Sequence, residues 1–180
     1  MLKNTHIWLL PYLRQKVLSR TAPSLPQPVH ILFCFADHFE PEWGGADYDR
    51  QCCRVREWAQ RYPYLARRHQ DADGCPPKHT FFYPAEVFQE EHIENLAGLC
   101  REGIGEMEIH LHHDEDTENS LREKLRRAKK DFAQHSLLGR DRETGQGRFG
   151  FIHGNWALNN SRPDGRWCGV NDETRILKEE

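Results

Sequence analysis

The chain has 180 residues, of which 37% are hydrophobic and 29% are charged, and this composition suits one globular domain. Its formal net charge of −3 gives no electrostatic reason to expect nucleic acid as a partner. The six cysteines include no CxxC pair, so a zinc site built from paired cysteines is not expected and the thiols are predicted to be reduced.

Residues 1–28 are predicted to form a short helix followed by a proline-containing linker. The apolar stretch of this helix contains Pro11 and is too short to span a bilayer, so no transmembrane segment is expected. It also lacks a cleavage site for a signal peptide, so the expected compartment is the cytoplasm. The apolar stripe of the helix could pack on its own domain or lie on a membrane surface. Its members are Leu9, Leu10, Leu13, Val17 and Leu18.

Residues 29–180 are predicted to form an α/β domain in which strands and helices alternate. Such alternation is typical of parallel strands joined by helical crossovers. The expected strands are 29–35, 79–83, 106–112 and 149–153, and the expected helices are 48–64, 86–101 and 117–135. A further helix begins at Asp172 and would bury Ile176 and Leu177, yet the sequence stops within about two turns. We therefore expect an incomplete domain.

Three of the expected strands end in side chains that can bind a metal ion. Asp37 and His38 follow the first strand, residues 110–114 end the third, and residues 153–156 end the fourth. Because the carboxyl ends of parallel strands meet at one edge of a sheet, these groups are predicted to converge on a divalent ion, with zinc favoured. The alternatives are that Asp37 and His38 cap a turn and that Asp114 caps the next helix. His110 and His153 could also be core histidines that only make hydrogen bonds.

An ordered set of motifs runs through the middle of the chain. Thr80-Phe81-Phe82 is followed by a helix, by Gly103, and by Glu106 and His110 at Glu-x-x-x-His spacing. Over residues 29–114 this order resembles the polysaccharide deacetylase family, carbohydrate esterase family 4. The resemblance implies an irregular (β/α) barrel, of which this chain would supply only the N-terminal part. It also implies a metal-dependent hydrolase that removes N-acetyl groups from a sugar or polysaccharide.

The resemblance also implies roles for individual residues. Asp37 resembles the catalytic base, His38 replaces a metal-binding aspartate, and His110 is a metal ligand. The third ligand would be His113 or Asp114, with Asp114 favoured because it has the family's four-residue spacing from His110. From their place after the fourth strand alone, His153, Asn155 and Trp156 are expected to line the substrate groove.

Two other interpretations remain open. His110-x-His112-x-Asp114 partly matches the HxHxDH pattern of metallo-β-lactamase-like hydrolases, although Glu115 stands where that pattern has its last histidine. The chain could also be a catalytically inactive, metal- or glycan-binding remnant of the deacetylase fold. Whether the deacetylase-like domain is active or inactive, a barrel that does not close leaves an open sheet edge beside the fourth strand. Self-association through that edge is expected.

Overall fold

The computed structural model describes residues 5–19 and 28–180, and the chain divides into two units between Phe33 and Cys34. The first unit contains the predicted N-terminal helix, α1 (Thr5–Ser19), which has no buried residue. Most of the predicted proline-containing linker lies outside the described residues. None of the described helices is both long enough and apolar enough to cross a membrane.

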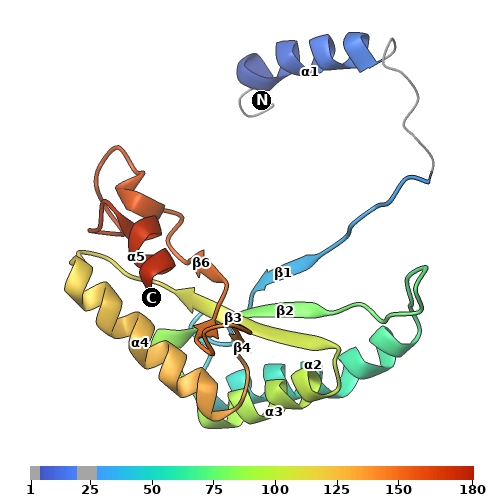
Figure 1. The fold of residues 1–180 in the computed structure, drawn as a ribbon, viewed down its shortest axis with the longest axis vertical. Coiled ribbons are helices and arrows are strands. Elements are labelled where there is room, and N and C mark those ends of the chain that lie inside the picture. The colour runs from blue at the N-terminus through green and yellow to red at the C-terminus, as the bar shows by residue number, and fades with distance from the viewer. Residues whose placement is uncertain (1–4, 20–27) are drawn as a thin grey trace. The chain divides into compact units, whose positions relative to one another are not determined.

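The second unit is built on a curled sheet of four parallel strands, which forms a half-barrel (Figure 1). The strand order is β1-β2-β3-β6, so the strands of this sheet lie side by side in the order in which they occur along the chain. The strands are β1 (Phe35–His38), β2 (His79–Pro84), β3 (Gly105–Leu111) and β6 (Phe151–His153). This arrangement confirms the predicted parallel α/β class and is compatible with part of a (β/α) barrel.

Three helices make the crossovers and lie along one side of the sheet (Figure 1). They are α2 (Tyr48–Arg67), α3 (Glu90–Arg101), which follows the short 3-10 helix η1 (Ala85–Val87), and α4 (Glu118–Gln134). The Asp47 side chain accepts a hydrogen bond from the Arg50 amide and caps α2, and Thr117 and Ser120 form a capping box on α4. Local sequence signals therefore fix where two of these helices start.

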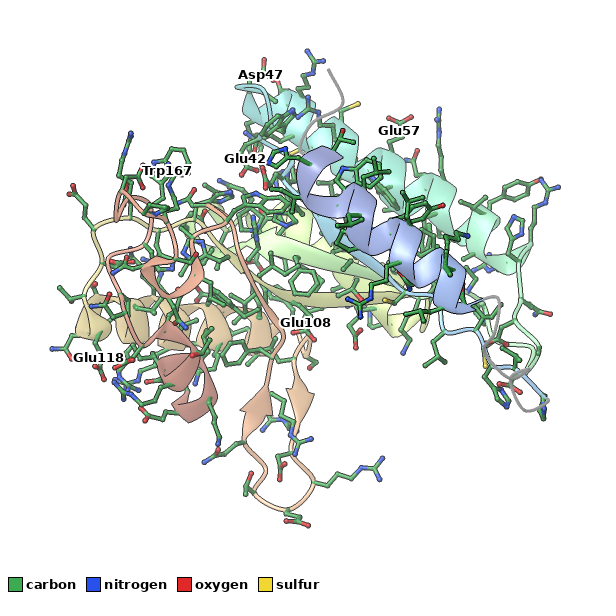
Figure 2. All side chains as sticks on the ribbon, turned by 90° about the horizontal axis from the view of Figure 1, so that it is seen from above. Glu42, Asp47, Glu57, Glu108, Glu118 and Trp167 are labelled. Atoms are coloured by element: carbon green, nitrogen blue, oxygen red, sulfur yellow. The ribbon has the colours of Figure 1, made fainter. Side chains whose placement is uncertain are left out.

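The main core fills the space between the helices and the sheet face that they cover. Alternate residues of a strand point to opposite faces, so Phe81 and Tyr83 of β2 and Met107 and Ile109 of β3 all point toward the helices. The opposite, concave face is more polar. There the side chain of Glu108 (labelled in Figure 2) accepts a hydrogen bond from the Gly150 amide.

The first strand differs from its prediction. Residues 29–34 are outside the strand, and β1 begins only at Phe35, so Asp37 and His38 belong to the strand rather than follow it. Ile31, Leu32 and Phe33 are 87%, 96% and 78% exposed. The apolar run has strand composition, but composition alone cannot supply the neighbouring strand and covering helix that would bury it.

A small antiparallel hairpin, β4 (Gly139–Arg140) with β5 (Gly147–Arg148), was not predicted. Its strands are exposed and therefore show no apolar alternation. The Asp141 side chain closes the turn by accepting hydrogen bonds from the Glu143 and Thr144 amides at 2.9 and 2.8 Å.

The final segment forms a second small core against α4. Helix α5 (Glu173–Glu179) buries Ile176 completely and Leu177 in part, as the sequence predicted. Between β6 and α5 the chain has only one short 3-10 helix, η2 (Leu158–Asn160). Within the sheet of the described residues, β1 and β6 each pair on one side only, which leaves the β6 edge open. Self-association through that edge stays a prediction.

Candidate metal centres

One cluster of metal-ligand side chains surrounds a single carboxylate oxygen at the carboxyl end of the sheet. Glu40 Oε1 lies 3.2 Å from His110 Nε2, 3.5 Å from His112 Nε2 and 3.6 Å from His38 Nδ1. We call these four residues, His38, Glu40, His110 and His112, the Glu40 centre. Ligand atoms of His38, Glu40 and His110 all lie within 4.8 Å of one another, a spacing that could hold a metal ion.

The sheet register brings these residues together on the concave face. His38 is aligned with Phe82 of β2, and His110 is aligned with Pro84 of β2 and Ile152 of β6. His112 lies two residues beyond His110 and so points to the same face. Glu40 reaches the histidines from the loop after β1. This loop begins at Phe39, whose amide donates a hydrogen bond to the Phe82 carbonyl at 3.0 Å.

Hydrogen bonds fix the tautomers of His110 and His112. His110 Nδ1 donates to the Ile152 carbonyl at 3.0 Å, and His112 Nδ1 donates to Glu86 Oε1 at 2.7 Å. In the neutral rings, both Nε2 atoms then carry lone pairs directed at the Glu40 carboxylate. Metal-binding histidines in proteins commonly show this pattern, in which the far ring nitrogen donates to a carbonyl or carboxylate.

Two lone pairs that face a carboxylate repel it unless a cation lies between them. A proton on His110 would serve, but burial, together with the neighbouring His112 and His38 rings, lowers the pKa of His110. A divalent ion would satisfy the facing atoms of His38, Glu40 and His110 at once, and His112 Nε2 lies 3.5 Å from the same Glu40 oxygen. The donor set, of imidazoles with one carboxylate, is one that zinc binds.

The Glu40 centre opens into a cleft of about 530 Å³. The Trp156 ring stacks on His38 at 5.5 Å between ring centroids and is 82% exposed, and Trp43 on the cleft wall is 73% exposed. Glu42 lies in the nearby loop ahead of α2 (Figure 2). Burial raises the pKa of Glu42, the charges of Glu40 and Glu86 raise it further, and its Oε2 has no hydrogen-bond partner among the described residues.

A second cluster lies on the helix-covered side of the same two strands. His113 is one residue out of phase with His112, and His153 is aligned with Leu111 of β3, whose side chain belongs to the second core. We call His113, His153, Cys168 and Glu173 the His113 cluster. All four residues are buried, and their ligand atoms lie within 4.8 Å of one another, so this cluster too could hold a metal ion.

Glu173 is the common partner within the His113 cluster. Its Oε1 lies 2.9 Å from His113 Nε2 and 3.8 Å from His153 Nε2, and its Oε2 accepts from Cys168 Sγ at 3.2 Å. Burial opposes ionisation of Glu173, but hydrogen bonds from His113, the Asn159 amide and Cys168 lower its pKa overall. Burial and the neighbouring His113 lower the pKa of His153 to about 4. Glu173 is thus a carboxylate and His153 a neutral imidazole near neutral pH.

The structure brings together only part of the predicted site. His38 and His110 meet in the Glu40 centre, but the expected convergence of Asp37 with them is not observed. Asp37 points to the other face of β1, where its Oδ2 lies 3.4 Å from His79 Nε2, and His79 packs against Trp58 of α2. The reason is strand alternation, which sends neighbouring residues of β1 to opposite faces.

Asp114 belongs to neither cluster. Its Oδ1 accepts hydrogen bonds from the Glu115 and Trp167 amides at 2.9 and 2.5 Å, so it holds a turn. It does not cap α4 either, because Thr117 does so. Figure 2 shows Trp167 on the segment between β6 and α5, far along the chain from Asp114.

The three residues expected to line a substrate groove separate at the end of β6. Trp156 alone lies at the Glu40 centre, against His38. His153 belongs to the His113 cluster, and the Asn155 side chain donates to the His113 carbonyl at 2.9 Å.

The sequence interpretation missed Glu40 and Glu86, and it named His112 only within residues 110–114 and in the metallo-β-lactamase-like pattern. Alternation along the third strand placed His112 on the face of His110, which was a usable signal for it. Glu40 and Glu86 lie in connections after β1 and β2, and no local pattern distinguishes them from other surface carboxylates. Cys168 and Glu173 of the second cluster carried no signal for the same reason.

Comparisons with protein-family models, curated proteins and solved structures gave no match to this chain. The resemblance to polysaccharide deacetylases therefore rests on the motifs of residues 29–114 alone.

Proposed function

We propose that this chain is a metal-dependent hydrolase whose Glu40 centre holds the ion, and that it removes N-acetyl groups from a sugar. One observation carries the proposal. The two rings of His110 and His112 each donate Nδ1–H to a fixed acceptor and direct Nε2 at the Glu40 carboxylate. Such preorientation supports a metal site over a solvated ion-pair network.

The position of the centre supports catalysis. In parallel α/β folds, active sites form at the carboxyl ends of the strands, where this centre lies. A bound divalent cation would polarise an acyl carbonyl and lower the pKa of a water molecule to about 7. His110, His112, His38 and Glu40 would hold it, while the Ile152 carbonyl and Glu86 keep two of the rings in place.

The proton carrier that we propose is Glu42 rather than Asp37. Asp37 points to the helix-covered face, whereas Glu42 is in the loop beside Glu40 and has a buried oxygen without a hydrogen-bond partner among the described residues. A carboxyl in this position could take the proton from the attacking water and deliver it to the leaving amine.

The sugar substrate is supported by two further features. The Thr80-Phe81-Phe82 and Glu106-to-His110 motifs resemble those of polysaccharide deacetylases, and both lie on adjacent strands of the sheet. The exposed Trp156 and Trp43 rings offer apolar faces beside the centre, against which the apolar face of a pyranose ring could pack.

The test combines metal analysis with acetate release from an N-acetylated oligosaccharide. We expect His112→Ala to lose one bound ion per chain and all acetate release, while Glu42→Gln keeps the ion and loses the activity. His69→Ala, which removes an exposed histidine after α2, is the matched control and should keep both. If the metal-loaded parent protein released no acetate from N-acetylated sugars, the proposed substrate class would be wrong. Unchanged metal content in His112→Ala would reject the centre.

A further inference from the structure

The His113 cluster is separate from the Glu40 centre and has no part in the proposed hydrolysis. Its donors come from three places in the chain: the end of β3, the end of β6, and the stretch that runs from Cys168 into α5. Their relative exposures are 3% for His113, 7% for His153, and 0% for Cys168 and Glu173. Four ionisable side chains so deeply buried require a reason, because burial of charge without compensation is costly.

The chemistry and spacing of the donors match a zinc site. Two imidazoles, a thiol and a carboxylate are all common zinc ligands. Ligands at about 2.0–2.3 Å from a tetrahedral ion lie roughly 3.3–3.8 Å from one another. The separations around Glu173 lie within about 0.4 Å of that range. They are 2.9 and 3.8 Å from its Oε1 to the two rings and 3.2 Å from its Oε2 to the Cys168 sulfur.

The two rings of the cluster show how an ion would be held. His153 Nε2 is buried without a hydrogen-bond partner among the described residues. On the far side of His113, Nδ1 lies 3.0 Å from Asp116 Oδ2, although outside good hydrogen-bonding geometry. Asp116 is fixed in turn by the Lys124 ammonium at 2.7 Å and by the Ser120 hydroxyl at 2.8 Å. A fixed carboxylate behind a ligand histidine is the usual outer support of a zinc site.

Ligation would replace the hydrogen bonds that His113 Nε2 and Cys168 Sγ donate to Glu173 with bonds to the ion. One further hydrogen bond then opposes this arrangement. His153 Nδ1 accepts from the Asn155 amide at 3.1 Å, and ligation through Nε2 would move the ring proton to Nδ1 and break that bond. A single hydrogen bond between neutral groups contributes little compared with the affinity of a four-ligand zinc site. The opposition is therefore too weak to exclude the ion.

We infer that His113, His153, Cys168 and Glu173 form a structural zinc site, distinct from the Glu40 centre. With four protein ligands and no exposed side, it leaves no open position for a substrate, as is typical of structural sites. It would join β3 and β6 to α5 and anchor the segment 154–172, which has little regular secondary structure and includes Trp156. Close backbone packing at Gly169 supports that anchoring. A Cβ on Gly169 would lie 2.4 Å from the Asp116 backbone, so only glycine fits beside Cys168.

Cobalt distinguishes this site from the Glu40 centre. Co²⁺ replaces zinc in tetrahedral sites, and a thiolate ligand gives it a charge-transfer band in the near ultraviolet that nitrogen and oxygen ligands do not give. The full chain, stripped of metal and titrated with Co²⁺, should therefore show this band. The band should disappear in Cys168→Ser and should persist in His110→Ala, which removes only a ligand of the Glu40 centre. Cys100→Ser, which changes a half-buried thiol outside both clusters, is the matched control and should keep the band.

A stability measurement complements the spectrum. A zinc chelator should lower the melting temperature of the His110→Ala protein but leave that of the His110→Ala, Cys168→Ser double variant unchanged. A cobalt-loaded parent with native circular dichroism but without a Cys168-dependent band would overturn the inference, and the cluster would then be a metal-free hydrogen-bond network. This result would leave the proposed hydrolase untouched, because the Glu40 centre contains no cysteine.

Discussion

Substitution of Gly154 by alanine should weaken metal binding at the Glu40 centre without unfolding the protein. Gly154 follows β6, and its amide donates to the Leu111 carbonyl at 2.9 Å, which holds it against the end of β3. A Cβ at this position would lie 2.3 Å from Cδ2 and 2.6 Å from both Cγ and Nε2 of His112. The φ angle of Gly154 is not positive, so the backbone itself accepts alanine.

The magnitude follows from how far His112 must move. To restore an ordinary contact of 3.4 Å, the His112 ring has to shift by about 1 Å. The side chain is 32% exposed, so the ring can move toward solvent at little cost to the fold. Displacement or loss of a supporting group at a metal site lowers metal affinity by about 10- to 100-fold, which is about 1.4 to 2.8 kcal/mol.

The assay is competition for Zn²⁺ against a chromophoric chelator, in a Cys168→Ser background so that only the Glu40 centre is counted. Gly147→Ala is the matched control, because a Cβ there meets nothing within 4 Å and its φ is not positive. We expect the Gly154→Ala affinity to fall by the stated factor and the control affinity to stay unchanged. Equal affinities for Gly154→Ala and the parent would refute the reasoning, since His112 would then not be a ligand.

Two further predictions concern the stability of the fold. Ile176→Ala should lower the free energy of unfolding by about 2–5 kcal/mol in urea titrations, because Ile176 is fully buried. Leu177→Ala should cost less, since Leu177 is only partly buried, and equal losses would contradict the described packing of α5. His92 is the pH-sensitive case: it lies 3.0 Å from the Tyr83 hydroxyl and 3.6 Å from the Cys52 sulfur, and burial lowers its pKa below 6.5. The unfolded state therefore binds more protons at acidic pH. The contribution of neutral His92 to the free energy of unfolding should be fully present above about pH 6.5 and should decrease as the pH falls toward the pKa of His92 in the folded state. His92→Gln should flatten this acid limb, and parallel stability curves would show that His92 does not contribute to it.

The sequence predicted the crossover helices and three of the four strands because their signals are local. Helix α4, for example, combines a capping box with an apolar stripe, and β3 shows a clean alternation of buried and polar residues. The prediction failed where burial depends on a partner. Residues 29–34 have the composition of a strand, but Ile31 and Leu32 are exposed in the structure.

For the site, the sequence by itself determined that His38 and His110 stand at the ends of two strands of the sheet and that strand alternation must separate His112 from His113. Only the tertiary structure decided which partners each histidine meets. The crossovers of the parallel sheet bring Glu40 and Glu86 to the face of His110 and His112, while β6 and α5 bring His153, Cys168 and Glu173 to the face of His113. Glu86 lies 26 residues from His112 along the chain, and Glu40 lies 70 residues from His110. The alternation of residues along a strand predicts the sheet face to which each side chain points. Contacts between residues so far apart in the sequence depend on how the whole chain packs.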